Sequence, residues 1–180
     1  MTKLRNTVKK GITVAALSLV VMTAAAPAVQ ADAAVKAACS TSTKSARSFT
    51  SGKLCYNVTS SNTVTCTGLK ANCSNTTSVS VPSTVSCNGK TYKVTKVANN
   101  AFKNNDCLKT VNVSNNVKSI GTNSFSGCDS LKNVKLGNCV KSVGSNAFSN
   151  CPKLNTVNGS SKIKSLGNNC FGNASYKMSK

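Results

Sequence analysis

The chain has 180 residues, of which 23 are Lys or Arg, three are Asp or Glu and none is His, so its formal net charge is +20. The absence of His excludes Ser-His-Asp hydrolases, and so few carboxylates disfavour paired-carboxylate glycoside hydrolysis. Ser–Lys chemistry is not excluded by composition, but Ser and Lys are too abundant here to indicate it. Trp is absent and Phe and Tyr are scarce, which favours a repeat architecture over a two-layer core. We therefore expect a non-enzyme.

Residues 1–31 have the order of a secretory signal peptide. Four basic residues among the first ten precede an apolar run, Ile12–Met22, and small residues continue to Ala31. The alternative is a membrane anchor, but the run is shorter than the roughly 20 residues that a spanning helix needs. Removing this segment leaves 19 basic and three acidic residues, a net charge of +16. We expect a secreted, extracellular protein that can associate with the cell surface, with no transmembrane span after signal removal and a flexible leader at residues 32–48.

Residues 49–93 predict two β-hairpins. Asn88-Gly89 is the preferred two-residue hairpin turn, here between residues 85–87 and 90–92. A second hairpin pairs residues 53–58 with 62–67 around Ser60-Ser61. In that register Cys55 faces Cys66 within disulfide reach, and we predict a bond between them. A loop of odd length would break this register.

From residue 94 to 176 the sequence repeats with a step of 23. The columns that share this step are Phe102, Phe125, Phe148 and Phe171; Val97, Ile120, Val143 and Leu166; Val94, Val117, Val140 and Ile163; Leu108, Leu131 and Leu154; Val111, Val134 and Val157; and Gly121, Gly144 and Gly167. A period in the low twenties lies within the leucine-rich-repeat range. Residues 177–180 are read as a short tail.

Each unit predicts a short strand, a second extended piece and a turn. Residues 108–113 alternate apolar and polar side chains, as a half-buried strand does. One such strand per unit gives a parallel sheet with neighbours about 4.8 Å apart. Residues 117–120 are a second short extended piece, and residues 123–128 are expected to form a brief helical or 3₁₀ turn that drives Phe125 inward. The phenylalanines would then stack along the solenoid axis.

The units at Val117–Leu136 and Val140–Leu154 resemble the BspA-type leucine-rich repeats of bacterial surface and secreted proteins. Upstream, residues 78–94 resemble the hairpin that often caps such arrays, as solenoid ends require. The resemblance covers about residues 50–175. It implies a repeat solenoid with an N-terminal β-hairpin cap at residues 49–93 and a cell-surface or extracellular binding role, of which adhesins are the best known. It does not identify a ligand.

Ten cysteines permit up to five disulfides. Cys128 and Cys151 follow a column Phe by three residues, where a small buried apolar side chain is the favoured interpretation. Cys107 and Cys139 have no Cys equivalents in the repeat. The sequence contains no Cys-x-x-Cys pair and no His, so we expect no metal site and no cofactor.

Lysines form columns of their own, which would place like charges about 5 Å apart at about 0.8 kcal/mol per neighbour before salt screening. A solvated lysine face is the simplest interpretation of a single column. Because acids are so scarce, binding of an anionic cell-envelope polymer is favoured instead. The candidate polyanion-binding residues are Lys118, Lys141 and Lys164.

Two alternatives remain open. An extracellular or surface protein could bind on the sheet face, where the candidates are Lys109, Asn112, Lys132, Lys135 and Thr156. The array could also be a structural spacer, or part of a surface assembly, without a ligand of its own. No aromatic platform accompanies the positive charge, so specific nucleic-acid binding is not expected.

Overall fold

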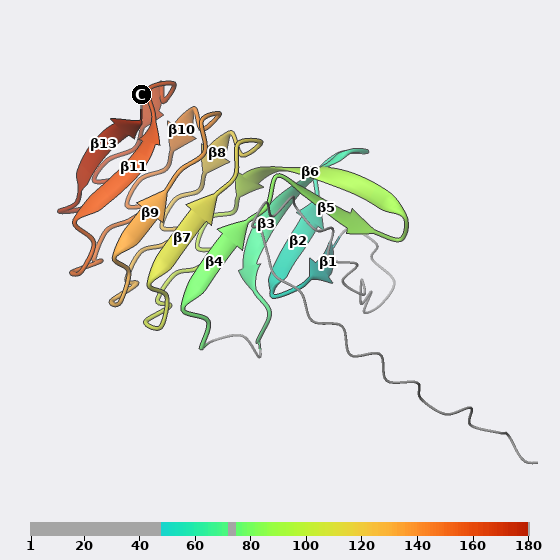
Figure 1. The fold of residues 1–180 in the computed structure, drawn as a ribbon, viewed down its shortest axis with the longest axis horizontal. Helices are drawn as coiled ribbons and strands as arrows, with labels where there is room; N and C mark the ends of the chain where they lie inside the picture. The colour runs from blue at the N-terminus through green and yellow to red at the C-terminus, as the bar shows by residue number, and fades with distance from the viewer. Residues whose placement is uncertain (1–47, 72–74, 180) are drawn as a thin grey trace, which may run out of the picture. The chain divides into compact units, whose positions relative to one another are not determined.

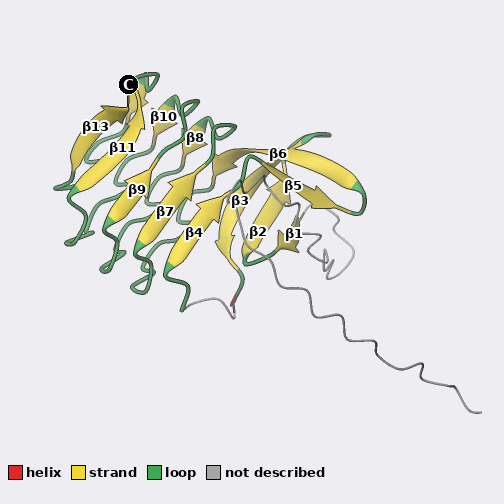
Figure 2. Ribbon diagram, in the orientation of Figure 1, coloured by secondary structure: helices red, strands yellow, loops and turns green. Residues whose placement is uncertain are grey.

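The computed structural model describes residues 48–71 and 75–179. The predicted signal peptide at residues 1–31 and the predicted leader at residues 32–48 lie outside this part of the chain, except for Ser48, which begins a strand. Among the described residues, no helix is both long and apolar enough to span a bilayer. Apart from a short 3₁₀ piece at Ala71, the described chain is built from strands and turns (Figure 2).

Two sheets run through the molecule (Figure 1). The first has the order β1-β2-β3-β6-β8-β10-β12, with β5 paired to β6: Ser48–Ser51, Leu54–Val58, Thr63–Leu69, Lys90–Val97, Ser119–Ile120, Ser142–Val143 and Ser165–Leu166, with β5 at Thr84–Cys87. The second has the order β13-β11-β9-β7-β4: Ser175–Ser179, Thr156–Ser160, Asn133–Lys135, Thr110–Val113 and Ser78–Val81. Each coil of the repeat contributes one strand to each sheet, so the predicted solenoid is confirmed.

In both sheets, each strand residue of the regular repeats pairs with the residue one repeat away in the sequence. In the second sheet Val111 lies opposite Val134, which lies opposite Val157. In the first sheet Ile120 pairs with Val143 in parallel. These side chains are buried between the sheets, with exposed fractions of 2 % or less. The sequence period and the stacking of coils are therefore the same repeat, because every coil places the same position over its neighbour.

The column phenylalanines form a continuous stack, as the period predicts. The ring centroid of Phe125 lies 5.0 Å from that of Phe102 and 5.1 Å from that of Phe148, with the rings within 4° of parallel. Backbone hydrogen bonds hold the coils in place, and the Phe125 amide donates to the Ala147 carbonyl at 2.8 Å. Each ring thus packs flat on the next within the core.

The segments that carry these rings are turns, and residues 123–128, where the sequence predicts a brief helical or 3₁₀ turn, form no regular helix. Asn123 and Gly127 adopt left-handed φ values of 52° and 72°. Left-handed residues at both ends keep this segment from extending into a helix. A bond from the Ser126 amide to the Asn123 carbonyl at 3.2 Å, with i→i+3 spacing, closes the turn.

The predicted register of the hairpin between β2 and β3 is wrong. Val58 pairs with Val64, which leaves a loop of odd length, and a β-bulge follows at Cys55/Tyr56. Cys66 consequently lies opposite Tyr56, and Cys55 lies opposite Gly68. Cys66 is buried and carries a free thiol, so the predicted bond to Cys55 is not formed. The physical reason is the odd-length loop, which shifts the pairing by one residue, and the bulge then moves Cys55 one residue further from Cys66.

The coil length changes at both ends of the array. Val81 pairs with Val113, so the first coil is longer than the repeat. Its extra residues include the predicted hairpin turn at Asn88-Gly89, where both φ values are positive. At the other end Val157 pairs with Tyr176, which makes the last coil shorter than the repeat. Strand β13 continues to Ser179, so residues 177–179 of the expected tail belong instead to a strand.

Candidate functional site

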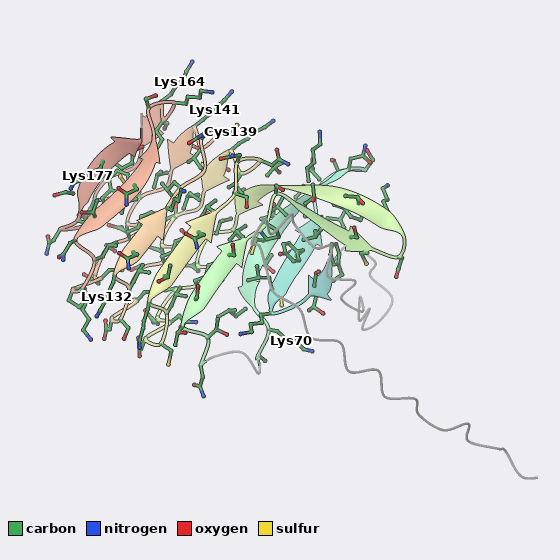
Figure 3. The ribbon with its side chains drawn as sticks, in the orientation of Figure 1. Lys70, Lys132, Cys139, Lys141, Lys164 and Lys177 are labelled. Atoms are coloured by element: carbon green, nitrogen blue, oxygen red, sulfur yellow. The ribbon has the colours of Figure 1, made fainter. Side chains whose placement is uncertain are left out.

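Three lysines form one row along the solenoid. The backbone amide of Lys141 donates to the carbonyl of Lys118, and the amide of Lys164 donates to the carbonyl of Lys141, both at 2.8 Å. All three side chains are exposed, at the point where each coil enters β8, β10 or β12. Lys141 and Lys164 project together from one side of the array, and Lys132 projects from another (Figure 3). The structure therefore brings together all three residues that the sequence proposed for polyanion binding.

A row of hydroxyl groups lies next to this lysine row, on the first sheet. Ser119 pairs with Lys96 on one side and with Ser142 on the other, and Ser142 pairs with Ser165. These residues line an open groove of about 430 Å³, to which Asn99, Thr122 and Ser145 also contribute.

The candidates for the sheet face also lie together, along the second sheet. Asn112 on β7 pairs with Lys135 on β9, and both side chains are exposed. The Lys132 amide donates to the Lys109 carbonyl at 2.9 Å, just before these strands begin. Thr156 is half-buried on β11 and pairs with Asn133. The lysines of this group belong to a separate row from Lys118, Lys141 and Lys164.

The two aspartates of the described residues lie outside both lysine rows. Asp106 and Asp129 are exposed and occupy equivalent turns of neighbouring coils. Neither lines the groove on the first sheet. In the part of the chain that the structure describes, no group of three or more His, Cys, Asp or Glu side chains could hold a metal ion.

The repeat cysteines are part of the core. Cys128 and Cys151 are buried, with exposed fractions of 0 % and 9 %. The Cys128 thiol donates to the Phe102 carbonyl at 3.2 Å, and the Cys151 thiol donates to the Phe125 carbonyl at 3.1 Å. A hydrogen bond with the Cys151 thiol, together with burial, raises the pKa of Cys128. The interpretation of both as small buried side chains agrees with this arrangement.

Burial also controls the chemistry of Cys66 in the hairpin. Desolvation raises the pKa of the Cys66 thiol from 9.0 to about 12. Cys107, in contrast, is an exposed free thiol on a turn. Because the thiolate is the reactive species, burial and a raised pKa protect Cys66, whereas Cys107 is open to reagents.

We expect iodoacetamide at mildly alkaline pH to modify Cys107 in the folded protein and to leave Cys66 and Cys128 unmodified. Both buried thiols should react only after denaturation. Peptide mapping of the alkylated protein, with and without denaturant, measures this difference. Modification of Cys66 at the rate of Cys107 would contradict the burial of the β2–β3 hairpin.

Two lysines of these surfaces were missed from the sequence. Lys96 occupies the repeat position of Ser119, so the repeat carried a signal for its place, but its residue type differs from the rest of the column. Lys177 pairs with Asn158, which in turn pairs with Lys135. No periodic signal could have found Lys177, because the last coil is shorter than the others.

Residues 95–179 match the BspA type leucine-rich repeat region, in six copies. No curated protein is similar to the chain at a significant level.

Several solved structures share the fold. A leucine-rich repeat protein from Bacteroides ovatus is 26 % identical with a TM-score of 0.64 over 72 % of this chain, and one from Bacteroides capillosus is 25 % identical with a TM-score of 0.68 over 74 %. This chain covers 34 % of the former protein and 99 % of the latter, so it spans about a third of the Bacteroides ovatus relative. A leucine-rich cell surface protein from Faecalibacterium prausnitzii has the same fold at 23 % identity, with a TM-score of 0.58 over 74 % of this chain and 44 % of its own.

Proposed function

Because residues 95–179 form a BspA-type leucine-rich repeat region, we propose that this chain is a non-catalytic, exported binding protein that contacts anionic cell-envelope polymers through Lys118, Lys141 and Lys164. The family and its structural relatives support an extracellular or surface location and a role in binding. The polymer class is our inference from the charge and geometry of the array.

The observation that carries this proposal is the registered lysine row. Ladder hydrogen bonds of 2.8 Å hold Lys118, Lys141 and Lys164 on successive coils. Two like charges about 5 Å apart, the approximate spacing of neighbouring coils, repel each other by about 0.8 kcal/mol in water before screening by salt. Neither Asp106 nor Asp129 borders the groove beside the row. A polymer with regularly spaced anionic groups would neutralise the row and remove this repulsion.

The experiment compares two triple variants that remove the same charge from different rows. The first is Lys118→Gln, Lys141→Gln and Lys164→Gln, and the control is Lys109→Gln, Lys132→Gln and Lys135→Gln. Binding to poly(glycerol phosphate) is measured over a salt gradient. As for single-stranded nucleic acids, each lysine–phosphate contact contributes about 0.7 to the slope of log K against log salt, so the first triple variant should lower that slope by about 2.

The control variant should bind nearly as the parent protein does. Equal losses in both triple variants would show that net charge alone governs binding, and no loss in either would show that the row is not the contact. Both variants should be at least as stable to heat as the parent, because each removes like-charge repulsion.

A second candidate is a protein ligand on the exposed face of the second sheet. The observation that favours it is the polar surface on which Asn112 and Lys135 lie side by side. A protein that binds there would lose affinity through the substitutions at Lys109, Lys132 and Lys135 and not through those of the first triple variant. The two triple variants therefore separate the candidates, and a spacer without a ligand would bind neither poly(glycerol phosphate) nor a surface protein.

A further inference from the structure

We propose that the groove on the first sheet is a second part of the polymer site and that it recognises hydroxyl groups of the ligand. The ligand is then a polyanion that carries hydroxyl groups, not one that lacks them. This inference rests on the proposed function, because it places the polymer along the same side of the array. We define the hydroxyl row as Ser119, Ser142 and Ser165, and the groove as the 430 Å³ concavity that it lines.

The hydroxyl row is in register and available to a ligand. Ser119 pairs with Ser142, and Ser142 pairs with Ser165, so the three hydroxyls repeat once per coil. Within the described part of the chain these hydroxyls have no hydrogen-bond partner, and their side chains are half-buried or exposed. A serine hydroxyl both donates and accepts, which matches a polyol hydroxyl better than it matches a fully ionised phosphate.

The groove continues across the coils. Its lining repeats as Ser119, Gly121 and Thr122 in one coil, and as Ser142, Gly144 and Ser145 in the next. Four strands at about 4.8 Å spacing make it about 14 Å long, which suits several units of a linear polymer. A Cβ at Gly121 or Gly144 would meet backbone atoms of the preceding coil, so these glycines let the coils pack closely along the groove.

Positive charge flanks the hydroxyl row on two sides. Lys96 pairs with Ser119 at one end of the row and lines the groove itself. Lys118 and Lys141 directly precede Ser119 and Ser142 in the chain, so their Cα atoms lie about 3.8 Å from those of the serines. A polymer with alternating anionic and hydroxyl groups would contact both rows at once, whereas a polymer without hydroxyls would contact only the lysines.

The test uses the triple variant Ser119→Ala, Ser142→Ala and Ser165→Ala, in the full chain, with three probes. Poly(glycerol phosphate) and polygalacturonate carry both anionic and hydroxyl groups, and linear inorganic polyphosphate carries no hydroxyls along its length. We expect affinity for at least one hydroxylated probe to fall by about two- to tenfold per lost hydrogen bond. Affinity for polyphosphate should stay unchanged. The hydroxylated probe with the larger loss identifies the source of the ligand, a polyol phosphate or an acidic glycan.

The matched control is Ser78→Ala, Ser80→Ala and Ser175→Ala, which removes three exposed hydroxyls from the second sheet. It should bind all three probes as the parent protein does. Unchanged binding of both hydroxylated probes by the groove variant would overturn the inference, and so would equal losses for polyphosphate. Polyphosphate binding by the Lys118, Lys141 and Lys164 variant tests the charge proposal, and binding of the hydroxylated probes by the serine variant tests the hydroxyl proposal. The two proposals can therefore fail independently.

Discussion

Phe125→Ala should lower the free energy of unfolding by about 3–5 kcal/mol, the range for truncating a fully buried aromatic side chain. Phe125 is 0 % exposed and lies between Phe102 and Phe148, with ring centroids 5.0 and 5.1 Å away. Truncation removes both stacking contacts and leaves a cavity in the middle of the array. Chemical denaturation followed by circular dichroism measures the change.

Phe125→Leu is the matched control, because it keeps most of the apolar volume and removes only the ring. We expect a smaller loss than for alanine, since volume-conserving core substitutions are tolerated best. A change near zero for Phe125→Ala would contradict the stack, because a ring with no packing partners could be removed without a cavity.

Gly144→Ala should destabilise the fold by about 1–3 kcal/mol, the range for overpacking a close contact. A Cβ at Gly144 would lie 2.5 Å from the Thr122 amide nitrogen and 2.7 Å from the Gly121 carbonyl carbon, both backbone atoms of the preceding coil. Backbone atoms cannot rotate away, so the coils themselves would have to separate. Gly144 does not have a positive φ, and space alone requires glycine there.

The prediction can be tested by the sign of the change in the free energy of unfolding. Where there is room, Gly→Ala stabilises a protein by about 0.4–1 kcal/mol, because it restricts the unfolded chain. Ser142→Ala, two residues earlier in the same coil, controls for the loss or gain of a small group at the surface and should be nearly neutral. A stabilised Gly144→Ala variant, measured by thermal unfolding, would show that neighbouring coils are not in contact at the glycine column.

The sequence alone determined the repeat, its register and the stack of phenylalanines. Apolar positions that recur with a fixed period can all be buried only if equivalent positions of successive coils stack on one another. Val111, Val134 and Val157 are stacked in this way. The same argument predicts that Lys118, Lys141 and Lys164 lie in one row, and ladder hydrogen bonds link their backbones. The Asn88-Gly89 turn was equally predictable, because two consecutive positive φ values suit few other residue pairs.

Tertiary structure decided the features that have no period. An odd-length loop and a β-bulge placed Cys55 out of opposition to Cys66, and both depend on how β2 and β3 fit against the rest of the sheet. The groove beside Ser119 and Ser142 could not be predicted from the sequence, because serine is common throughout this chain. Only the pairing of strands shows which serines share a face. Lys177 joins the row of Lys135 through a coil of a different length. Periodicity determines contacts between equivalent positions, whereas contacts between non-equivalent ones depend on the packed backbone, where sheet pairing and excluded volume select one register.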